Sequence, residues 1–267
     1  MLTSLLLILL GLFAGLVGAL AGIGGGIIIT PILAIHFGIP IREAIGTSLV
    51  AVITTSAASS SVHLQRHTTD IRLGMTLELA TAFGAATTAY IVGYLNRNAL
   101  EGLFVAFLLW GALSLLRRKQ DEVGDESSPA LIQTAAEIPD YTPQRYPLGL
   151  SASLVAGGLS GLLGIGGGPI KVPVMYLFMG VPLIVATATS NFMIGVTAAA
   201  SAFVYFRRGD ILAGVAAPLA VGVFVGSLIG AKLSPRIHSK YLIYLLVAIM
   251  LYLSGHLAFH LWGELHA

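Results

Sequence analysis

Long apolar stretches recur from one end of this 267-residue chain to the other. Each holds about 20 residues, the length that crosses roughly 30 Å of hydrocarbon as a helix. The chain is 56% hydrophobic and only 10% charged, with a mean hydropathy of +0.90, whereas about 25% of the residues of a soluble domain are charged. The stretches do not alternate polar and apolar residues as the strands of a membrane barrel do. The sequence therefore predicts an all-α integral membrane protein.

Composition also excludes several kinds of partner and chemistry. The formal net charge is only +2, and no basic stripe with interleaved aromatic residues occurs, so we expect no nucleic-acid partner. The chain has no cysteine, which rules out disulfides and thiol-based metal or redox chemistry. We expect neither a cofactor nor a bound metal. The first apolar stretch lacks a basic start and a small-residue cleavage site, so we interpret it as a retained membrane helix.

The sequence "GIGGG" occurs twice within apolar stretches, at residues 22–26 and 164–168. When Gly22 is aligned with Gly164, 13 of the 34 positions from 22 to 55 are identical, and the identities include the glycines and prolines that shape the backbone. A shift of two residues then pairs Asp70 with Asp210. The chain therefore reads as an internal duplication.

The duplication divides the chain into three regions. We predict membrane repeat 1 at 1–116, a cytoplasmic linker at 117–147 that is rich in charge and proline, and membrane repeat 2 at 148–267. Each repeat would hold about five helical segments, giving roughly eight to ten membrane segments, some of them broken or re-entrant. If every segment crosses, nine Lys or Arg residues lie in inner loops and four in outer loops. This distribution favours inverted repeats, whereas re-entrant short segments would give parallel ones.

Glycine clusters inside a membrane leave backbone groups without helical partners, which is tolerated where the backbone lines a cavity or binds a ligand. Interrupted helices at matching places in two halves indicate the substrate site of a transporter. A short helix after each cluster would present N–H donors and partial positive charge, which suit an anion. Tight helix packing is the alternative explanation for small residues. We predict that the substrate binds at Gly22, Gly24, Gly25, Gly26, Gly164, Gly166, Gly167 and Gly168.

One ionisable residue, Lys171, lies in the second short apolar segment, where the first half has Ile29. Charge within a membrane segment indicates function, so we predict that Lys171 binds the anion. Snorkelling to the membrane surface is the alternative. Repeated polar residues would complete the site, although their hydroxyl groups could instead bond to their own helix. These residues are Thr47, Ser48, Thr189, Ser190 and Asn191.

Prolines and two further titratable residues have weaker roles in this interpretation. Four prolines near the short segments are predicted structural helix breaks: Pro31, Pro40, Pro173 and Pro182.

Glu78 and His36 are candidates for carrying a coupled proton, although neither has a counterpart in the other half. An interfacial role is the preferred interpretation of both.

Two other functions can be weighed against an anion transporter. The sequence "GLSG" at 158–161 matches the G-x-S-G of rhomboid-type intramembrane proteases, with His256 or His260 as the activating base of Ser160. Ser160 pairs with Gly18 in the first half, however, so we interpret it as a packing residue and expect no enzyme. A passive anion channel with the same pore stays open. Neither glycine cluster is followed by the Lys-Ser/Thr of a P-loop, so the chain gives no support for an ATP-driven pump.

The order of motifs resembles that of a known family. The first half carries "GxxGxxxGIGGGxxxxP", and both halves then carry "GxP" and "AxxTS". This pattern, spread over nearly the whole chain outside 117–147, is similar to the sulfite exporter TauE/SafE family, also grouped as the TSUP superfamily. The resemblance carries the glycine motif onto 22–26 with Pro31 and onto 164–168 with Pro173.

The resemblance also implies a function that the residues alone do not give. It implies a secondary transporter or facilitator, in the lipid bilayer of a prokaryotic plasma membrane, for small sulfur-containing anions such as sulfite or organosulfonates. It leaves open which anion is carried, in which direction, and whether protons or sodium ions are coupled to it.

Overall fold

The computed structural model describes residues 2–122, 141–234 and 239–266, and all regular structure in these ranges is helical. The helices are α1 (Leu2–Ala21), α2 (Gly26–His36), α3 (Ile41–Gln65), α4 (Ile71–Val92), α5 (Arg97–Glu122), α6 (Tyr146–Leu163), α7 (Gly168–Pro173), the π-helix η2 (Val174–Phe178), α8 (Leu183–Arg208), α9 (Ala213–Leu233) and α10 (Ser239–His266). Six described helices, α1, α3, α4, α6, α8 and α9, are long and apolar enough to cross a membrane. The predicted all-α membrane class is confirmed.

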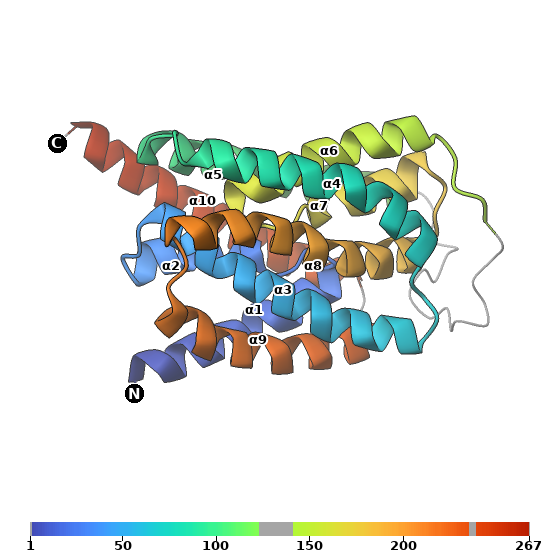
Figure 1. Ribbon diagram of the computed structural model, residues 1–267, viewed down its shortest axis with the longest axis horizontal. Coiled ribbons are helices and arrows are strands. Elements are labelled where there is room, and N and C mark those ends of the chain that lie inside the picture. The colour runs from blue at the N-terminus through green and yellow to red at the C-terminus, as the bar shows by residue number, and fades with distance from the viewer. Residues whose placement is uncertain (1, 123–140, 235–238, 267) are drawn as a thin grey trace.

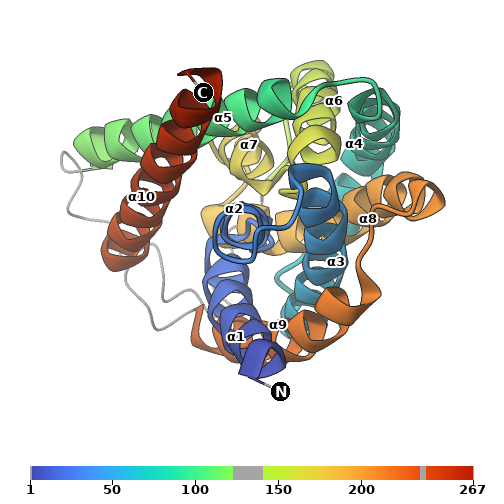
Figure 2. The same cartoon turned by 90° about the vertical axis from the view of Figure 1, so that its left-hand side faces the viewer.

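The helices long and apolar enough to cross a membrane run along the long axis of the molecule, and both chain ends lie at the same end of it (Figure 1). Helices α5 and α10 lie obliquely across this axis, since the view down it shows them lengthwise (Figure 2). Helices α3 and α8 lie at the centre, where Ile45, Leu49 and Val52 pack with Ile194 and other apolar residues of α8 (Figure 2). Two edges of the predicted linker are helical, because α5 continues to Glu122 and α6 begins at Tyr146. Residues 141–145 of the predicted linker have no regular structure, and residues 123–140 lie outside the described residues.

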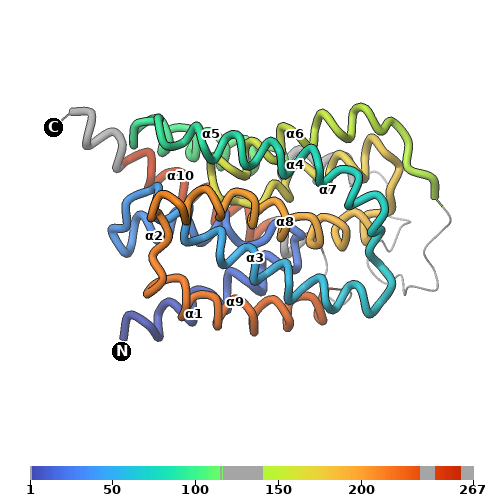
Figure 3. The backbone as a smooth tube through the Cα atoms, in the orientation of Figure 1, coloured from blue at the N-terminus to red at the C-terminus, as the bar shows by residue number. Residues whose placement is uncertain are grey.

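The chain reverses direction at each glycine cluster. Helix α1 starts at the end of the molecule to which α2 returns, and α6 starts at the opposite end, to which α7 and η2 return (Figure 3). In the first bend Gly22, Gly24 and Gly25 have φ angles of 70°, 78° and 75°. The glycines at the equivalent positions of the second bend, which are Gly164, Gly166 and Gly167, have the same three values. Residues with a Cβ atom adopt such angles only with strain, so both reversals depend on glycine.

The two bends touch each other through their backbones. A Cβ atom placed on Gly26 would collide with the carbonyl oxygen of Gly164, and one placed on Gly168 would collide with that of Gly22. Val52 of α3 and Ile194 of α8 lie against the bends, because both would touch a Cβ atom on Gly24 or on Gly166. The bends therefore cross at a point that leaves no room for a side chain between them.

Several contacts recur at equivalent positions, meaning those that pair when Gly22 is aligned with Gly164. Thr47 Oγ1 accepts the N–H of Leu212 at 3.1 Å, and Thr189 Oγ1 accepts that of Asp70 at 2.9 Å. Likewise, Arg66 donates to the carbonyl of Ala231 at 3.1 Å, and Arg208 donates to that of Ala89 at 2.8 Å. Because Asp70 and Leu212 take the same place, the two-residue shift that pairs Asp70 with Asp210 is wrong. The duplication itself stays a prediction, which these contacts support.

The four prolines differ in their effect on the helices. Pro40 and Pro182 immediately precede α3 and α8, whereas Pro173 lies within a continuous helical segment that changes from α-helix to π-helix after it. Pro31 lies inside α2, which continues to His36, so the prediction of a break there is not met. Proline removes only one backbone hydrogen bond of its helix, and the remaining bonds hold α2 together beyond it.

Alanine at Gly26 should destabilise the protein by about 1–3 kcal/mol, because the added methyl group would press on the carbonyl of Gly164. Gly26 does not need a positive φ, so crowding alone is tested. The matched control is Gly102→Ala in α5, where a Cβ atom meets nothing within 4 Å. Thermal unfolding in detergent measures both variants, and equal midpoints would contradict the crossing of the bends.

Candidate functional site

The predicted serine and threonine residues hold the two bends in place. Ser48 Oγ donates to the carbonyl of Gly164 at 3.2 Å and receives a hydrogen bond from Thr30 at 2.7 Å. Ser190 Oγ donates to the carbonyl of Gly22 at 3.1 Å. Each serine thus binds the bend of the other half. Thr47 and Thr189 accept the N–H groups at the start of α9 and α4, so both bond between elements. Ser48 also lies 2.9 Å from the carbonyl of Ile45 in its own helix, so its hydroxyl hydrogen has an acceptor there as well as at Gly164.

The backbone of each bend keeps free hydrogen-bond donors. In the part of the chain that the structure describes, the N–H groups of Gly25, Gly26 and Ile27 have no backbone acceptor. The same holds for the N–H groups of Gly167 and Gly168. All these glycines are buried. Buried N–H groups without a partner are rare because they cost free energy, so a ligand that accepts from them would be stabilised here.

Asn191 of α8 adds a polar side chain beside the first bend. Its side-chain N–H donates to the carbonyl of Ala19 at 3.3 Å, near the end of α1. Its Oδ1 atom is buried and has no hydrogen-bond partner among the described residues, and the whole residue is only 1% exposed. The residue at the equivalent position of the first half is Leu49, so this unsatisfied amide exists in one half only.

The side chain of Lys171 is paired with the carboxylate of Glu78. Its Nζ atom lies 3.2 Å from Glu78 Oε2 of α4 and donates to Thr197 Oγ1 of α8 at 2.8 Å. Thr197 in turn donates to Glu78 Oε1 at 2.6 Å, so the three side chains form a closed triad. The side chains of Lys171 and Glu78 are 1% and 4% exposed. Snorkelling of Lys171 to a surface is therefore wrong.

The sequence did not reveal the Lys171–Glu78–Thr197 triad, although two signals pointed toward it. Lys171 and Glu78 are ionisable residues of opposite charge in apolar segments, which favours pairing. Thr197 is equivalent to Thr55, so a threonine occupies this position in both halves. Thr55 bonds only to its own helix, at the carbonyl of Ala51. The structure encloses Glu78 within the protein, where the sequence favoured an interfacial role.

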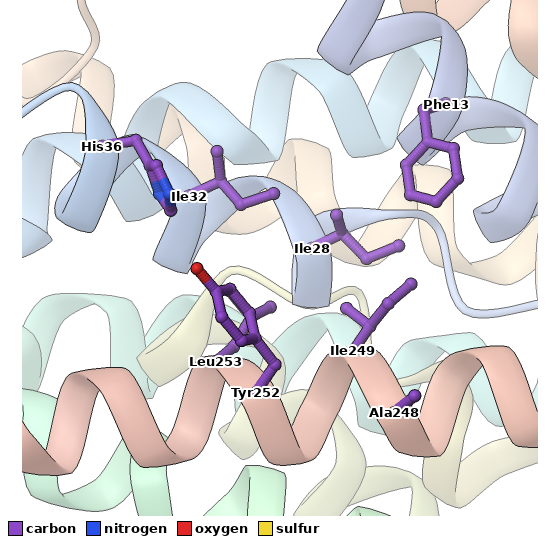
Figure 4. Close-up of a pocket in the computed structure, with 8 residues that line it drawn as sticks. All are labelled: Phe13, Ile28, Ile32, His36, Ala248, Ile249, Tyr252 and Leu253. Atoms are coloured by element: carbon purple, nitrogen blue, oxygen red, sulfur yellow. The ribbon is translucent and has the colours of Figure 1, made fainter.

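A pocket of about 420 Å³ lies between α1, α2 and α10 (Figure 4). Its walls are mostly apolar, from residues such as Phe13, Ile28 and Leu253, and His36 and Tyr252 supply its polar groups. The His36 ring stacks on His256 with a centroid distance of 6.1 Å. Such walls suit an apolar group better than an anion.

A second pocket, of about 350 Å³, lies at the start of α4 and is lined by His67, Thr68, Asp70, Tyr141 and others. Tyr141 donates to Asp70 Oδ2 at 2.7 Å. Burial, with the Asp70 hydrogen bond second, raises the pKa of Tyr141, so its hydroxyl stays protonated. Because the Asp70 N–H binds Thr189, this polar pocket adjoins a predicted site residue.

The described residues do not form the Ser–His pair of an intramembrane protease. Ser160 Oγ is buried without a hydrogen-bond partner. The ring of His256 instead stacks on His36 and on Tyr252. The side chain of His260 lies outside the described part of the chain.

Proteins named as probable membrane transporters match this chain along almost its full length. The model of the family described as Sulfite exporter TauE/SafE matches residues 7–257. The probable membrane transporter protein YunE of Bacillus subtilis is 30% identical over 261 residues, which cover 94% of this chain and 95% of that protein. A probable membrane transporter protein of Methanocaldococcus jannaschii is 26% identical over 260 residues, covering 92% and 91%.

A plant protein matches over a shorter region. Sulfite exporter TauE/SafE family protein 1 of Arabidopsis thaliana is 36% identical over 121 residues, covering 42% of this chain and 27% of that protein. No solved structure matches the chain.

Replacing Lys171 alone by methionine should destabilise the protein by about 3–5 kcal/mol, because Glu78 would stay buried without its partner. The double variant Lys171→Met with Glu78→Gln should regain most of this loss, since no charge is left uncompensated. Thermal unfolding of the two single variants and the double variant gives the coupling between the residues. Additive losses would contradict a direct ion pair.

Proposed function

Because the chain belongs to the sulfite exporter TauE/SafE family of membrane transporters, we propose that it carries small sulfur-containing anions, such as sulfite or organosulfonates. It acts as a secondary transporter or facilitator in a prokaryotic plasma membrane. Family membership gives a transporter with a small-molecule substrate. The sulfur chemistry of the substrate is the proposed part.

The proposed substrate site lies where the two glycine bends meet. The observation that carries this proposal is the set of free backbone N–H groups at Gly25–Ile27 and Gly167–Gly168, buried at the crossing of the bends. An anion with several oxygen atoms can accept several such hydrogen bonds at once, and the start of α2 adds partial positive charge. Lys171 and the amide donor of Asn191 lie on elements that pack around the same bends.

The two halves would act as inverted repeats. Support comes from the α1–α2 hairpin, which opens toward the end that holds both chain ends, while the α6–α7 hairpin opens toward the opposite end (Figure 1). The contacts that recur at equivalent positions, such as those of Thr47 and Thr189, support equivalent roles for the halves. In this proposal each hairpin closes one side of the membrane, and parting the buried bends alternates access.

Purified protein in proteoliposomes should take up radiolabelled sulfite or an organosulfonate, and sulfate should compete poorly. The panel comprises sulfite, thiosulfate, methanesulfonate and sulfate, each with and without a pH gradient. Saturable uptake that a gradient can drive uphill indicates a transporter, whereas weakly saturating flux that only equilibrates would indicate the channel. Uptake no faster than in empty liposomes for every anion would refute the proposal.

Asn191→Leu places at this position the residue that the first half has at Leu49, so the change should be tolerated by the fold. We expect sulfite uptake to fall by about tenfold, because the site loses the amide Nδ2, which has a second N–H besides the one that it donates to Ala19 and can offer it to an anion. The control is Ser201→Ala on the same helix, where the hydroxyl group bonds to the carbonyl of Thr197. Unchanged uptake by Asn191→Leu would remove Asn191 from the site.

A further inference from the structure

The Lys171–Glu78–Thr197 triad breaks the match between the two halves of the transport core. At the equivalent positions Lys171 corresponds to Ile29, Glu78 to Ala220 and Thr197 to Thr55. The equivalent set thus keeps the hydroxyl group and lacks both charges. A buried ion pair seldom stabilises a protein more than apolar residues of the same volume do. The ion pair joins Lys171 of the second half to Glu78 of the first, and the equivalent pair, Ile29 and Ala220, carries no charge. Stability does not explain the ion pair, so we look for a functional explanation.

Charge balance restricts what an anion can do at this triad. Lys171 and Glu78 neutralise each other while they are in contact at 3.2 Å. An anion that binds Lys171 Nζ displaces the Glu78 carboxylate from it. Glu78 would then be an unpaired negative charge inside a membrane protein, which costs much free energy. If Glu78 binds a proton at the same time, every state of the site is electrically neutral. One proton then accompanies each singly charged anion.

We propose that Glu78 is the proton-binding site of the transporter, and that proton and anion move together because they exchange partners at Lys171. A proton from water on the loading side binds the Glu78 carboxylate as the anion takes its place on Lys171 Nζ. On the release side the anion leaves, Glu78 returns its proton to water, and the ion pair re-forms. This inference rests on the proposed function and names its coupled ion.

Thr197 is positioned to keep the hydrogen bonds satisfied during the exchange. Its hydroxyl group accepts from Lys171 at 2.8 Å and donates to Glu78 at 2.6 Å. A hydroxyl group can both donate and accept, so it can accept a hydrogen bond from the protonated Glu78 carboxyl and turn its own hydrogen toward the anion. It also lies 3.2 Å from the carbonyl of Met193, a second acceptor for that hydrogen.

No other titratable group within the described residues faces Glu78. Lys171 comes from α7 and Thr197 from α8, and these two supply its contacts. The other titratable side chains of α4, α6 and α8 lie in the first or last turns of their helices, and Tyr176 of η2 is exposed. They are Arg72, Tyr90, Tyr146, Tyr205, Arg207 and Arg208.

The test measures coupling directly in proteoliposomes with radiolabelled methanesulfonate, a permanent monoanion whose own protonation cannot imitate coupling. If the wild type carries sulfite but not methanesulfonate, sulfite is the probe, and empty liposomes correct for passive entry. An inward gradient of about one pH unit should give about tenfold accumulation in the wild type, because coupling of one proton to one anion transfers the whole gradient. A pH-sensitive dye inside the vesicles should report acidification during uptake.

Glu78→Gln should lose this accumulation while it still exchanges internal for external anion, because Lys171 keeps its charge and no proton site remains. The matched control is Glu101→Gln, since Glu101 is also a buried carboxylate, paired with Arg97 at 2.7 Å on α5. It should accumulate the anion as the wild type does. Monodisperse elution in detergent verifies that each variant is folded.

Three results would overturn the inference and leave the proposed function intact. These are wild-type uptake without accumulation or acidification, normal accumulation by Glu78→Gln, and loss of both exchange and accumulation by a folded Glu78→Gln. The wild-type measurements need no variant, so they decide the matter even if Glu78→Gln fails to fold. Absence of flux for every anion in the wild type would instead refute the proposed function.

Discussion

Backbone polar groups inside a membrane need partners, and the two glycine bends are where helices cannot provide them. Side chains near the centre of the molecule supply some of the missing hydrogen-bond partners. Ser48 and Ser190 reach across from α3 and α8 to bind the carbonyls of the opposite bend. The carbonyls are thereby satisfied, whereas N–H groups at the start of α2 and α7 stay free among the described residues. This imbalance makes the centre an environment for groups that accept hydrogen bonds, which is the chemistry of an oxyanion.

The matched halves differ where selectivity would be expected. Three features recur at equivalent positions: the φ angles of the glycines, the bonds from the serines to the opposite bend, and the bonds from Arg66 and Arg208 to helix carbonyls. The helical scaffold therefore has two similar sides. Lys171, Glu78 and Asn191 have no polar counterparts, because the residues equivalent to them are Ile29, Ala220 and Leu49. A symmetric scaffold can alternate between two states, whereas an asymmetric set of charges binds one substrate in one orientation. The proposed transport mechanism uses both properties.

The sequence predicted the fold well because apolar length and glycine are strong local signals. Pro40 and Pro182, which were predicted near helix boundaries, directly precede α3 and α8. Pro31 misled because one proline does not end a helix that packing supports. The pairing of Lys171 with Glu78 joins residues far apart in the chain and depends on how α4 packs against α7 and α8, which no local pattern encodes. Ser48 and Ser190 were identified as site residues, yet their binding of the opposite bend also required the tertiary structure.

The crossing of the bends restricts which residues the two glycine clusters can hold. Gly26 rests on the backbone of Gly164, and Gly168 rests on that of Gly22, so each copy occupies the space that a side chain of the other would need. Neither bend can hold a larger residue at the crossing unless the backbone of the other bend moves away. Substitutions at these four positions are therefore coupled between the two bends. This steric restriction applies to the glycines at the crossing. About one helical turn beyond Gly168, at Lys171, the second half has a charged residue where the first half has Ile29.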